Sequence, residues 1–271
     1  MIPSGHVEAE KKGEISPMCC GISKLRPSYL VRKYAFSSSF WAIFFNPYYF
    51  SRRELFDNVK ELGRFLSGTV LDVGCGTQPY RHLLHCTEYK GMEFDTPANR
   101  KNKKADYFYD GVFFPQADAS FDSILCTEVL EHVFEPELFV REMARVLKPG
   151  GKLLLTAPFV WAEHEQPYDY ARYSSFGLRS LLEKNGFEII EHRKTCGNVT
   201  VMFQLLNDCI YRKVTGDGGL LRLSAAHFLS AVININGFFL DLLLPRNNDL
   251  YLDNVIYAIR KGSSGGSTEI P

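Results

Sequence analysis

The sequence has no net charge, because 31 Lys and Arg residues balance 31 Asp and Glu residues. A chain without excess positive charge has no general attraction to nucleic acid or to an anionic membrane. Its seven cysteines form no CxxC pair and no Cys/His spacing typical of a zinc site. Reduced thiols in a cytoplasmic protein fit this pattern best. Residues 1–16 are polar and charged, so we expect no secretory signal.

A glycine is also missing where a dinucleotide site would require it. Residues 69–80 read TVLDVGCGTQPY, a short apolar strand that breaks into Gly74-Cys75-Gly76, with Thr77 as the candidate start of a helix. Glycines between a strand and a helix let a ligand approach the backbone closely. The nicotinamide dinucleotide fingerprint continues to a third glycine, but here that position is Pro79. An oxidoreductase is therefore disfavoured and stays an alternative.

The next predicted strand supplies an acidic residue at an informative distance. Tyr89–Asp95 reads YKGMEFD and places Glu93 about twenty residues after the glycines. In doubly wound folds, an acid at this spacing binds the ribose hydroxyls of a nucleotide. Two glycines and an acid fit a nucleoside without phosphates better than a dinucleotide.

Five segments in succession then point to one family: VLDVGCG (70–76), YKGMEFD (89–95), YDGVFFP (109–115), FDSILCTEVLEHV (121–133) and RVLKPGGKLLLTAP (145–158). In this order they resemble the motifs of class I S-adenosylmethionine-dependent methyltransferases, above all the small-molecule group with an LDVGCG motif. The resemblance implies a Rossmann-like, doubly wound α/β fold. It would have a mostly parallel seven-stranded sheet, helices on both faces and S-adenosylmethionine as cofactor.

The resemblance also implies roles for individual residues. Glu93 would bind the ribose, with Phe94 beside it, and Asp110 with Gly111 would bind the adenine edge. Asp110 as a turn residue is the alternative. Thr127 would lie near the transferred methyl group. The methionine end of the cofactor would be held by Asp72, Gly74, Cys75, Gly76 and Thr77.

Candidates for acceptor chemistry follow the fourth and fifth predicted strands. An unperturbed histidine can take a proton from a hydroxyl, so His132 is either a general base or a residue that shapes the cofactor pocket. The loop at 158–173 holds Glu163 and His164, which are candidates for a base or a substrate clamp. An Asn/Asp-Pro-Pro-Tyr segment is absent, which argues against methylation of a nucleobase or of glutamine. Transfer to oxygen, nitrogen or carbon stays open.

No metal site is expected. His82 and His85 share one face of a predicted short helix at 80–85, but they lack a third ligand. Glu163, His164 and Glu165 are ligand types, yet three adjacent residues do not easily converge on one ion.

The flanking segments predict the domain organisation. We expect a flexible N-terminus (1–26), an aromatic helical element (27–67), the methyltransferase domain (68–261) and a flexible tail (262–271). Inside the domain, residues 196–245 form an apolar helical insertion that delays the last strand. Residues 220–244 are a cap, a membrane-surface or lipid contact, or a dimer interface. An eighteen-residue stretch, 223–240, lacks Asp, Glu, Lys and Arg, which reaches the lower length for a membrane span.

Together these features predict an enzyme that transfers a methyl group from S-adenosylmethionine to a small-molecule acceptor. The aromatic segment and the apolar insertion favour a hydrophobic, lipid-linked or glycan-linked acceptor over nucleic acid. The protein would be cytoplasmic, with peripheral contact to a membrane through residues 220–244 as an option, and monomeric or homodimeric. A non-catalytic S-adenosylmethionine-binding protein is the alternative from another class.

Overall fold

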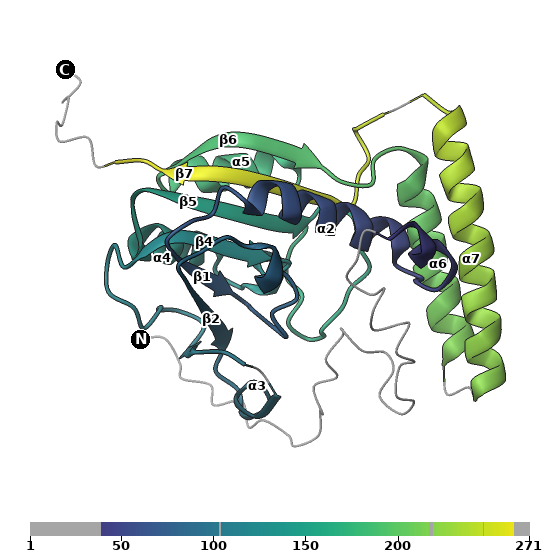
Figure 1. The fold of residues 1–271 in the computed structure, drawn as a ribbon, viewed down its shortest axis with the longest axis horizontal. Helices are drawn as coiled ribbons and strands as arrows, with labels where there is room; N and C mark the ends of the chain where they lie inside the picture. Colours follow the sequence, from purple (N-terminus) through teal and green to yellow (C-terminus); the bar gives the residue numbers. More distant parts are fainter. Residues whose placement is uncertain (1–38, 103, 217–218, 246, 263–271) are drawn as a thin grey trace, which may run out of the picture.

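The computed structural model describes residues 39–102, 104–216, 219–245 and 247–262, so the predicted flexible N-terminus and nearly all of the predicted tail lie outside the described residues. A seven-stranded sheet with the order β3-β2-β1-β4-β5-β7-β6 forms the centre (Figure 1). β7 runs antiparallel to β5 and β6, and the pairs among β1 to β5 are parallel. The predicted mostly parallel, doubly wound sheet is confirmed. Its strands are β1 (Thr69–Val73), β2 (Glu88–Phe94), β3 (Tyr107–Tyr109), β4 (Phe121–Thr127), β5 (Leu147–Pro158), β6 (Phe187–Lys194) and β7 (Asp253–Arg260).

Helices cover both faces of the sheet, as predicted. On one face, α4 (Pro136–Val146) and α5 (Ser175–Lys184) pack their apolar sides onto the strands. On the other face lies α2 (Tyr49–Gly63), whose leucine and valine side chains contact the sheet at Val70 and Leu154. Because both faces are covered, the central strands are continuous apolar runs. Leu153, for example, is fully buried.

Two local predictions are wrong. No helix begins at Thr77: Gln78 has a positive φ of 62° and Pro79 has no N–H, so only a 3-10 turn, η2 (Arg81–Leu83), forms where a short helix was expected at 80–85. The polar and basic residues at 97–104 predict a solvated loop, but this segment begins with a short helix, α3 (Pro97–Asn102). Thr96 starts α3, because its hydroxyl accepts the N–H of Asn99 at 3.0 Å.

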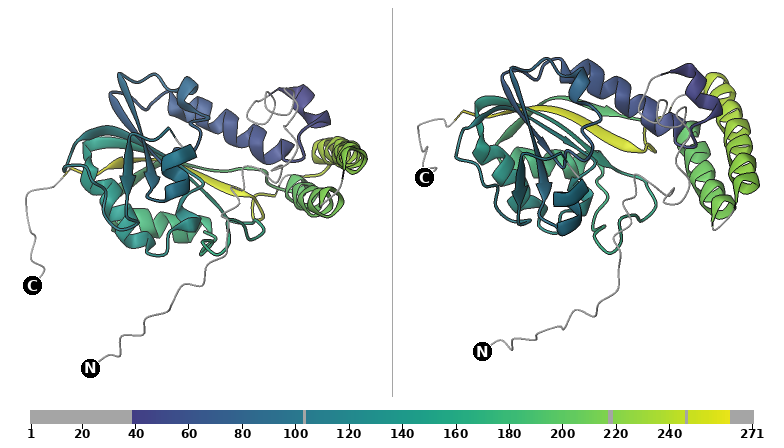
Figure 2. Two further views of the ribbon diagram at one scale, coloured as in Figure 1. Left: turned by 90° about the horizontal axis from the view of Figure 1, so that it is seen from below. Right: turned by 60° about the horizontal axis from the view of Figure 1, so that its bottom comes forward.

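The apolar insertion consists of two helices, α6 (Val199–Thr215) and α7 (Leu220–Leu243), between β6 and β7. They lie side by side at one end of the sheet (Figures 1 and 2), so the predicted helical C-terminal insertion is confirmed. A short 3-10 helix, η1 (Phe40–Phe44), packs against α7 together with the start of α2. We call η1, α6 and α7 the helical cap.

Candidate active site

The candidate site lies where the direction of strand order reverses. From β1 the chain continues to β2 on one side, whereas β4 pairs with β1 on the other side. In open α/β sheets, ligands bind at this switch point, outside the carboxyl ends of the strands. Three connections leave the sheet there: the glycine loop after β1, the turn after β4 and the loop at 158–173 after β5.

The two glycines of the loop after β1 have different structural roles. Gly74 has φ of +71°, and a Cβ at this position would lie 2.3 Å from Cγ2 of Val129 in the turn after β4. Gly76 has φ of +53°, and nothing lies within 4 Å of its Cβ position. Gly74 therefore lets two of the site's connections touch, and Gly76 leaves open space at the backbone for a ligand.

The N–H groups of the glycine loop are used inside the protein. Those of Gly74 and Cys75 donate to the carbonyl of Met92 at 2.9 and 3.2 Å. The N–H of Gly76 donates to the carboxylate of Glu93. A pyrophosphate needs N–H groups that point at the ligand, so this loop does not offer a dinucleotide cradle. The geometry agrees with the missing third glycine.

The predicted ribose and adenine residues lie along one edge of the site. Glu93 is almost fully buried beside the glycine loop, and Phe94 follows it at the end of β2 with a partly exposed ring. A Cβ on Gly111 would lie 2.9 Å from the Phe94 ring, so glycine permits this contact. Asp110 accepts the N–H groups of Val112 and Phe113 through one oxygen, at 2.9 and 3.0 Å. These bonds hold the pKa of Asp110 below its usual range.

Two residues that the resemblance assigned to the methionine end have buried side chains. Asp72 is 2% exposed and accepts a hydrogen bond from the Tyr89 hydroxyl. Burial raises the pKa of Asp72 to about 7. The Cys75 thiol packs on Gly91, where an added Cβ would lie 2.7 Å from its sulfur. Both side chains therefore face the protein interior, where they support the glycine loop.

Thr127 ends β4 and is paired with Thr156 of β5, so the predicted methyl-site residue lies at the edge of the switch point. Glu128 follows it with φ of +53°, and its carboxylate accepts the Thr156 hydroxyl at 2.8 Å. Burial, together with the neighbouring charge of Glu131, raises the pKa of Glu128 to about 8.

The loop at 158–173 brings His164 to the turn that carries His132. Their rings meet edge to face with centroids 4.7 Å apart. Backbone N–H groups of Tyr170 and Ala171 donate to the carbonyl of Glu131 at 2.8 and 3.2 Å, which fixes the loop on this turn. Two predicted residues from distant parts of the sequence thus share one site.

The third predicted acceptor residue lies apart, and one residue was missed. Glu163 is exposed and accepts a hydrogen bond from Gln166 at 3.2 Å. Glu131, which was not assigned a role, is fully buried between the two histidines: its Oε1 lies 3.7 Å from Nε2 of His132 and 3.9 Å from Nε2 of His164. The signal for Glu131 was an acid directly beside a predicted site histidine, just after a buried strand.

Burial also shifts the pKa values of Glu131 and His164. It raises the pKa of Glu131 to about 8. It lowers the pKa of His164, with a further lowering from the charge of His132. His164 is therefore a neutral ring at pH 7, able to accept a proton or to act as a ligand.

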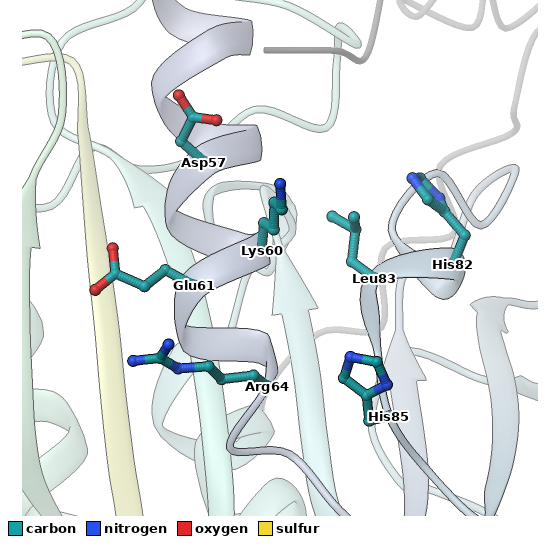
Figure 3. A pocket seen from close by; sticks show the side chains of 7 residues that line it. All are labelled: Asp57, Lys60, Glu61, Arg64, His82, Leu83 and His85. Atoms are coloured by element: carbon teal, nitrogen blue, oxygen red, sulfur yellow. The ribbon is translucent and has the colours of Figure 1, made fainter.

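A hollow on the outer side of α2 carries none of the predicted site residues (Figure 3). It holds both histidines of the segment after the glycine loop, and the His82 ring also lies 6.1 Å from that of Phe56. The hollow is lined by Asp57, Lys60, Glu61, Arg64, His82, Leu83 and His85.

Comparison with known proteins identifies the family of the domain that carries this site. A family model described as a methyltransferase domain matches residues 48–192, more than half of the chain. An O-methyltransferase, rstn1, of Aspergillus nomiae is 29% identical over 160 residues, which cover 49% of this chain and 71% of the relative. The thiol S-methyltransferase TMT1B of Rattus norvegicus is 32% identical over 130 residues, 43% of this chain and 51% of the relative.

A solved phosphoethanolamine N-methyltransferase 2 of Haemonchus contortus, in complex with S-adenosylmethionine, is 18% identical with a TM-score of 0.48. The match covers 88% of this chain and 59% of that one. The matched range contains the whole glycine loop, Glu93 and both histidines of the cluster, His132 and His164. The chain therefore belongs to the methyltransferase domain family, as an enzyme that takes its methyl group from S-adenosylmethionine.

Proposed function

We propose that this enzyme methylates an oxygen atom of a hydrophobic or lipid-linked small molecule, with its helical cap lying on a membrane surface. The observation that carries this proposal is the inverted packing of α7. This helix buries small and polar residues and exposes large apolar ones.

The buried side of α7 consists of Ala226, Ser230, Asn234 and Gly237. At Gly237 an added Cβ would lie 2.9 Å from Phe203 of α6, so the two helices approach each other closely. The other sides of α7 expose Leu220, Leu221, Phe228, Leu229, Val232, Phe239, Leu240, Leu242 and Leu243. A helix whose large apolar side chains face outward requires an apolar environment there.

The exposed apolar surface continues from α7 onto η1. Phe40 packs edge to face against Phe238 of α7 with ring centroids 5.9 Å apart, and it is itself half exposed. Trp41, beside it, is 64% exposed. Tryptophan is enriched where a protein meets the boundary between lipid and water. By length and hydropathy α7 is also sufficient to cross a bilayer, but its packing against α6 and η1 favours an orientation along the surface.

The cap is connected to the acceptor side of the site. Trp161, in the loop that carries His164, packs in one apolar cluster with Ile235 and Phe238 of α7. Its ring also lies 6.2 Å from that of Tyr48, which precedes α2. A molecule held by the membrane beside the cap would therefore lie next to the His164 loop.

The chemistry of the transfer requires little from the protein. The acceptor oxygen attacks the methyl carbon, a C–O bond forms and the C–S bond breaks. The electron pair of that bond goes to sulfur, which leaves S-adenosylhomocysteine. Catalysis consists mainly of in-line positioning and exclusion of water, with removal of the hydroxyl proton. The relative from Aspergillus nomiae is named an O-methyltransferase, which supports oxygen as the acceptor atom.

Transfer of a labelled methyl group tests this proposal. The full chain is incubated with methyl-labelled S-adenosylmethionine and phosphatidylcholine vesicles that contain a total lipid extract. We expect label in the organic phase, and at least about tenfold less for a Leu221→Ser/Phe228→Ser double variant. The matched control is Phe176→Ser, because Phe176 is 84% exposed on α5, away from the cap.

Label that stays in the aqueous phase, or a double variant as active as the control, would show that the acceptor is not reached through a membrane. No label in any phase from a protein that binds S-adenosylmethionine would favour the non-catalytic alternative. A dimer interface on α7 would appear as a concentration-dependent mass that the double variant abolishes.

A further inference from the structure

We propose that Glu131, His132 and His164 bind one divalent cation of the first transition row and leave coordination positions open. Their ligand atoms all lie within 4.8 Å of one another. Two ligands at about 2.1 Å from one ion are at most about 4.2 Å apart. The distances from Glu131 Oε1 to the two histidine nitrogens, 3.7 and 3.9 Å, are within that limit.

Glu131 is a carboxyl group buried beside two histidines. It is 0% exposed, and among the described residues neither of its oxygens has a hydrogen-bond partner. Such a group is costly unless it is paired, hydrogen-bonded or bound to a metal. The guanidinium of Arg172 lies in this region but is already bound to both oxygens of Asp169, at 2.6 and 2.7 Å. A cation between Glu131 and the histidines would satisfy the carboxylate.

Both histidines direct a ring nitrogen toward Glu131, and their other nitrogen is held by acceptors. Nδ1 of His132 lies 2.6 Å from the carbonyl of Tyr168, which can only accept, so Nδ1 carries a proton and Nε2 is the nitrogen that faces Glu131. Nδ1 of His164 faces the carbonyl of Ala162 at 3.2 Å and the carboxylate of Asp169 at 3.4 Å. The guanidinium of Arg172 also lies 3.4 Å from this nitrogen, but it already donates to both oxygens of Asp169. Partners of this kind orient metal-binding histidines.

The ligand set determines the kind of ion. Two imidazoles and one carboxylate suit Zn²⁺, Fe²⁺, Co²⁺ or Mn²⁺ better than the all-oxygen preference of Ca²⁺. Three protein ligands leave at least one position for another molecule, as in catalytic metal sites. The sequence predicted no metal site here, because Glu163, His164 and Glu165 are adjacent and do not easily converge on one ion. The structure instead joins His164 to a turn more than thirty residues earlier in the chain.

The cluster lies beside the cofactor loop, so we infer that the ion activates the acceptor. This role of the ion rests on the proposed methyl transfer. Val129, two residues before Glu131, contacts Gly74 of the cofactor loop. An acceptor hydroxyl bound at the open position would lose its proton to solvent more readily, because the cation stabilises the alkoxide. The oxygen then attacks the methyl group as described above. The acceptor is then a molecule with an oxygen that can bind the metal ion.

Metal titration tests the site without any assay of activity. The full chain, purified without a histidine tag and treated with a chelator, is titrated with Co²⁺, followed by its visible ligand-field bands, and then with Zn²⁺. We expect one equivalent to bind, and about 100-fold weaker binding in His132→Ala, His164→Ala and Glu131→Gln. The matched control is His82→Ala, which should bind as wild type. Glu131→Gln keeps the shape of the side chain, and circular dichroism reports whether each variant is folded.

Absence of saturable binding, or equal weakening in His82→Ala, would overturn the metal site. A parallel titration with S-adenosylhomocysteine separates the two proposals. A protein that binds the nucleoside but no metal contradicts only this inference, whereas one that binds metal but no nucleoside contradicts the proposed function.

Discussion

At the scale of single residues, the two glycines of the cofactor loop make a direct comparison possible. Gly74→Ala places a Cβ 2.3 Å from Val129 at a backbone φ of +71°, so we expect a loss of about 2–4 kcal/mol in the free energy of unfolding. Gly76→Ala meets no atom within 4 Å and should cost only about 1 kcal/mol. Its Cβ instead enters the space of the ligand, so affinity for S-adenosylhomocysteine falls.

Urea unfolding and calorimetric titration of both variants measure these two effects. The result that contradicts this account is a Gly74→Ala variant with wild-type stability, or a Gly76→Ala variant with wild-type affinity.

The raised pKa of Asp72 makes the free energy of unfolding depend on pH. Burial, with a smaller contribution from the charge of Glu93, raises its pKa to about 7, although the hydrogen bond from Tyr89 acts in the opposite direction. The unfolded value is about 3.9. Between these values the native chain holds a proton that the unfolded chain releases. The contribution to stability is therefore complete below about pH 4 and is lost as pH rises through 7.

Asp72→Asn remains uncharged and can still accept the Tyr89 hydroxyl. Relative to wild type, this variant should gain stability between pH 5 and pH 8, by at most roughly 4 kcal/mol. Urea unfolding at pH 5 and pH 8 gives the free energy of unfolding of both proteins. If the variant and the wild type differed by the same amount at the two pH values, a raised pKa of Asp72 would be contradicted.

At the scale of elements, Asn234 joins the three parts of the helical cap. Its amide donates to the carbonyls of Ile43 and Asn46, both at 3.0 Å, and its oxygen accepts from Asn207 of α6 at 2.9 Å. Asn234→Ala leaves these buried groups without partners, so we expect a loss of about 2–4 kcal/mol in the free energy of unfolding.

The matched control is Asn236→Ala on the same helix, because Asn236 is exposed and, within the described part of the chain, its amide bonds only to the carbonyl of Val232. It should change stability by less than about 0.5 kcal/mol. Equal effects of the two variants would mean that the cap is not held by this buried network.

At the scale of the whole molecule, the strands along the chain were predictable because buried parallel strands are apolar runs. TVLDV and LLLTA read as strands from composition alone, and a glycine turn after the first identified the switch point. The convergence of His132, His164 and Glu131 was not predictable, because it depends on the path of a sixteen-residue loop. The inward direction of Asp72 depends on strand pleat and on Tyr89, which the motif does not reveal.

The most direct test of this account is calorimetric titration of the full chain with S-adenosylhomocysteine. We predict one site with a Kd in the micromolar range, about −8 kcal/mol, and at least about 100-fold weaker binding in Glu93→Ala. Glu93→Gln, which can still accept the N–H of Gly76, should also bind more weakly if the charge of Glu93 binds the ribose, as the resemblance implies. Glu183→Ala, on the exposed surface of α5, should bind as wild type. No binding, or binding unchanged in both Glu93 variants, would contradict a cofactor site at the switch point.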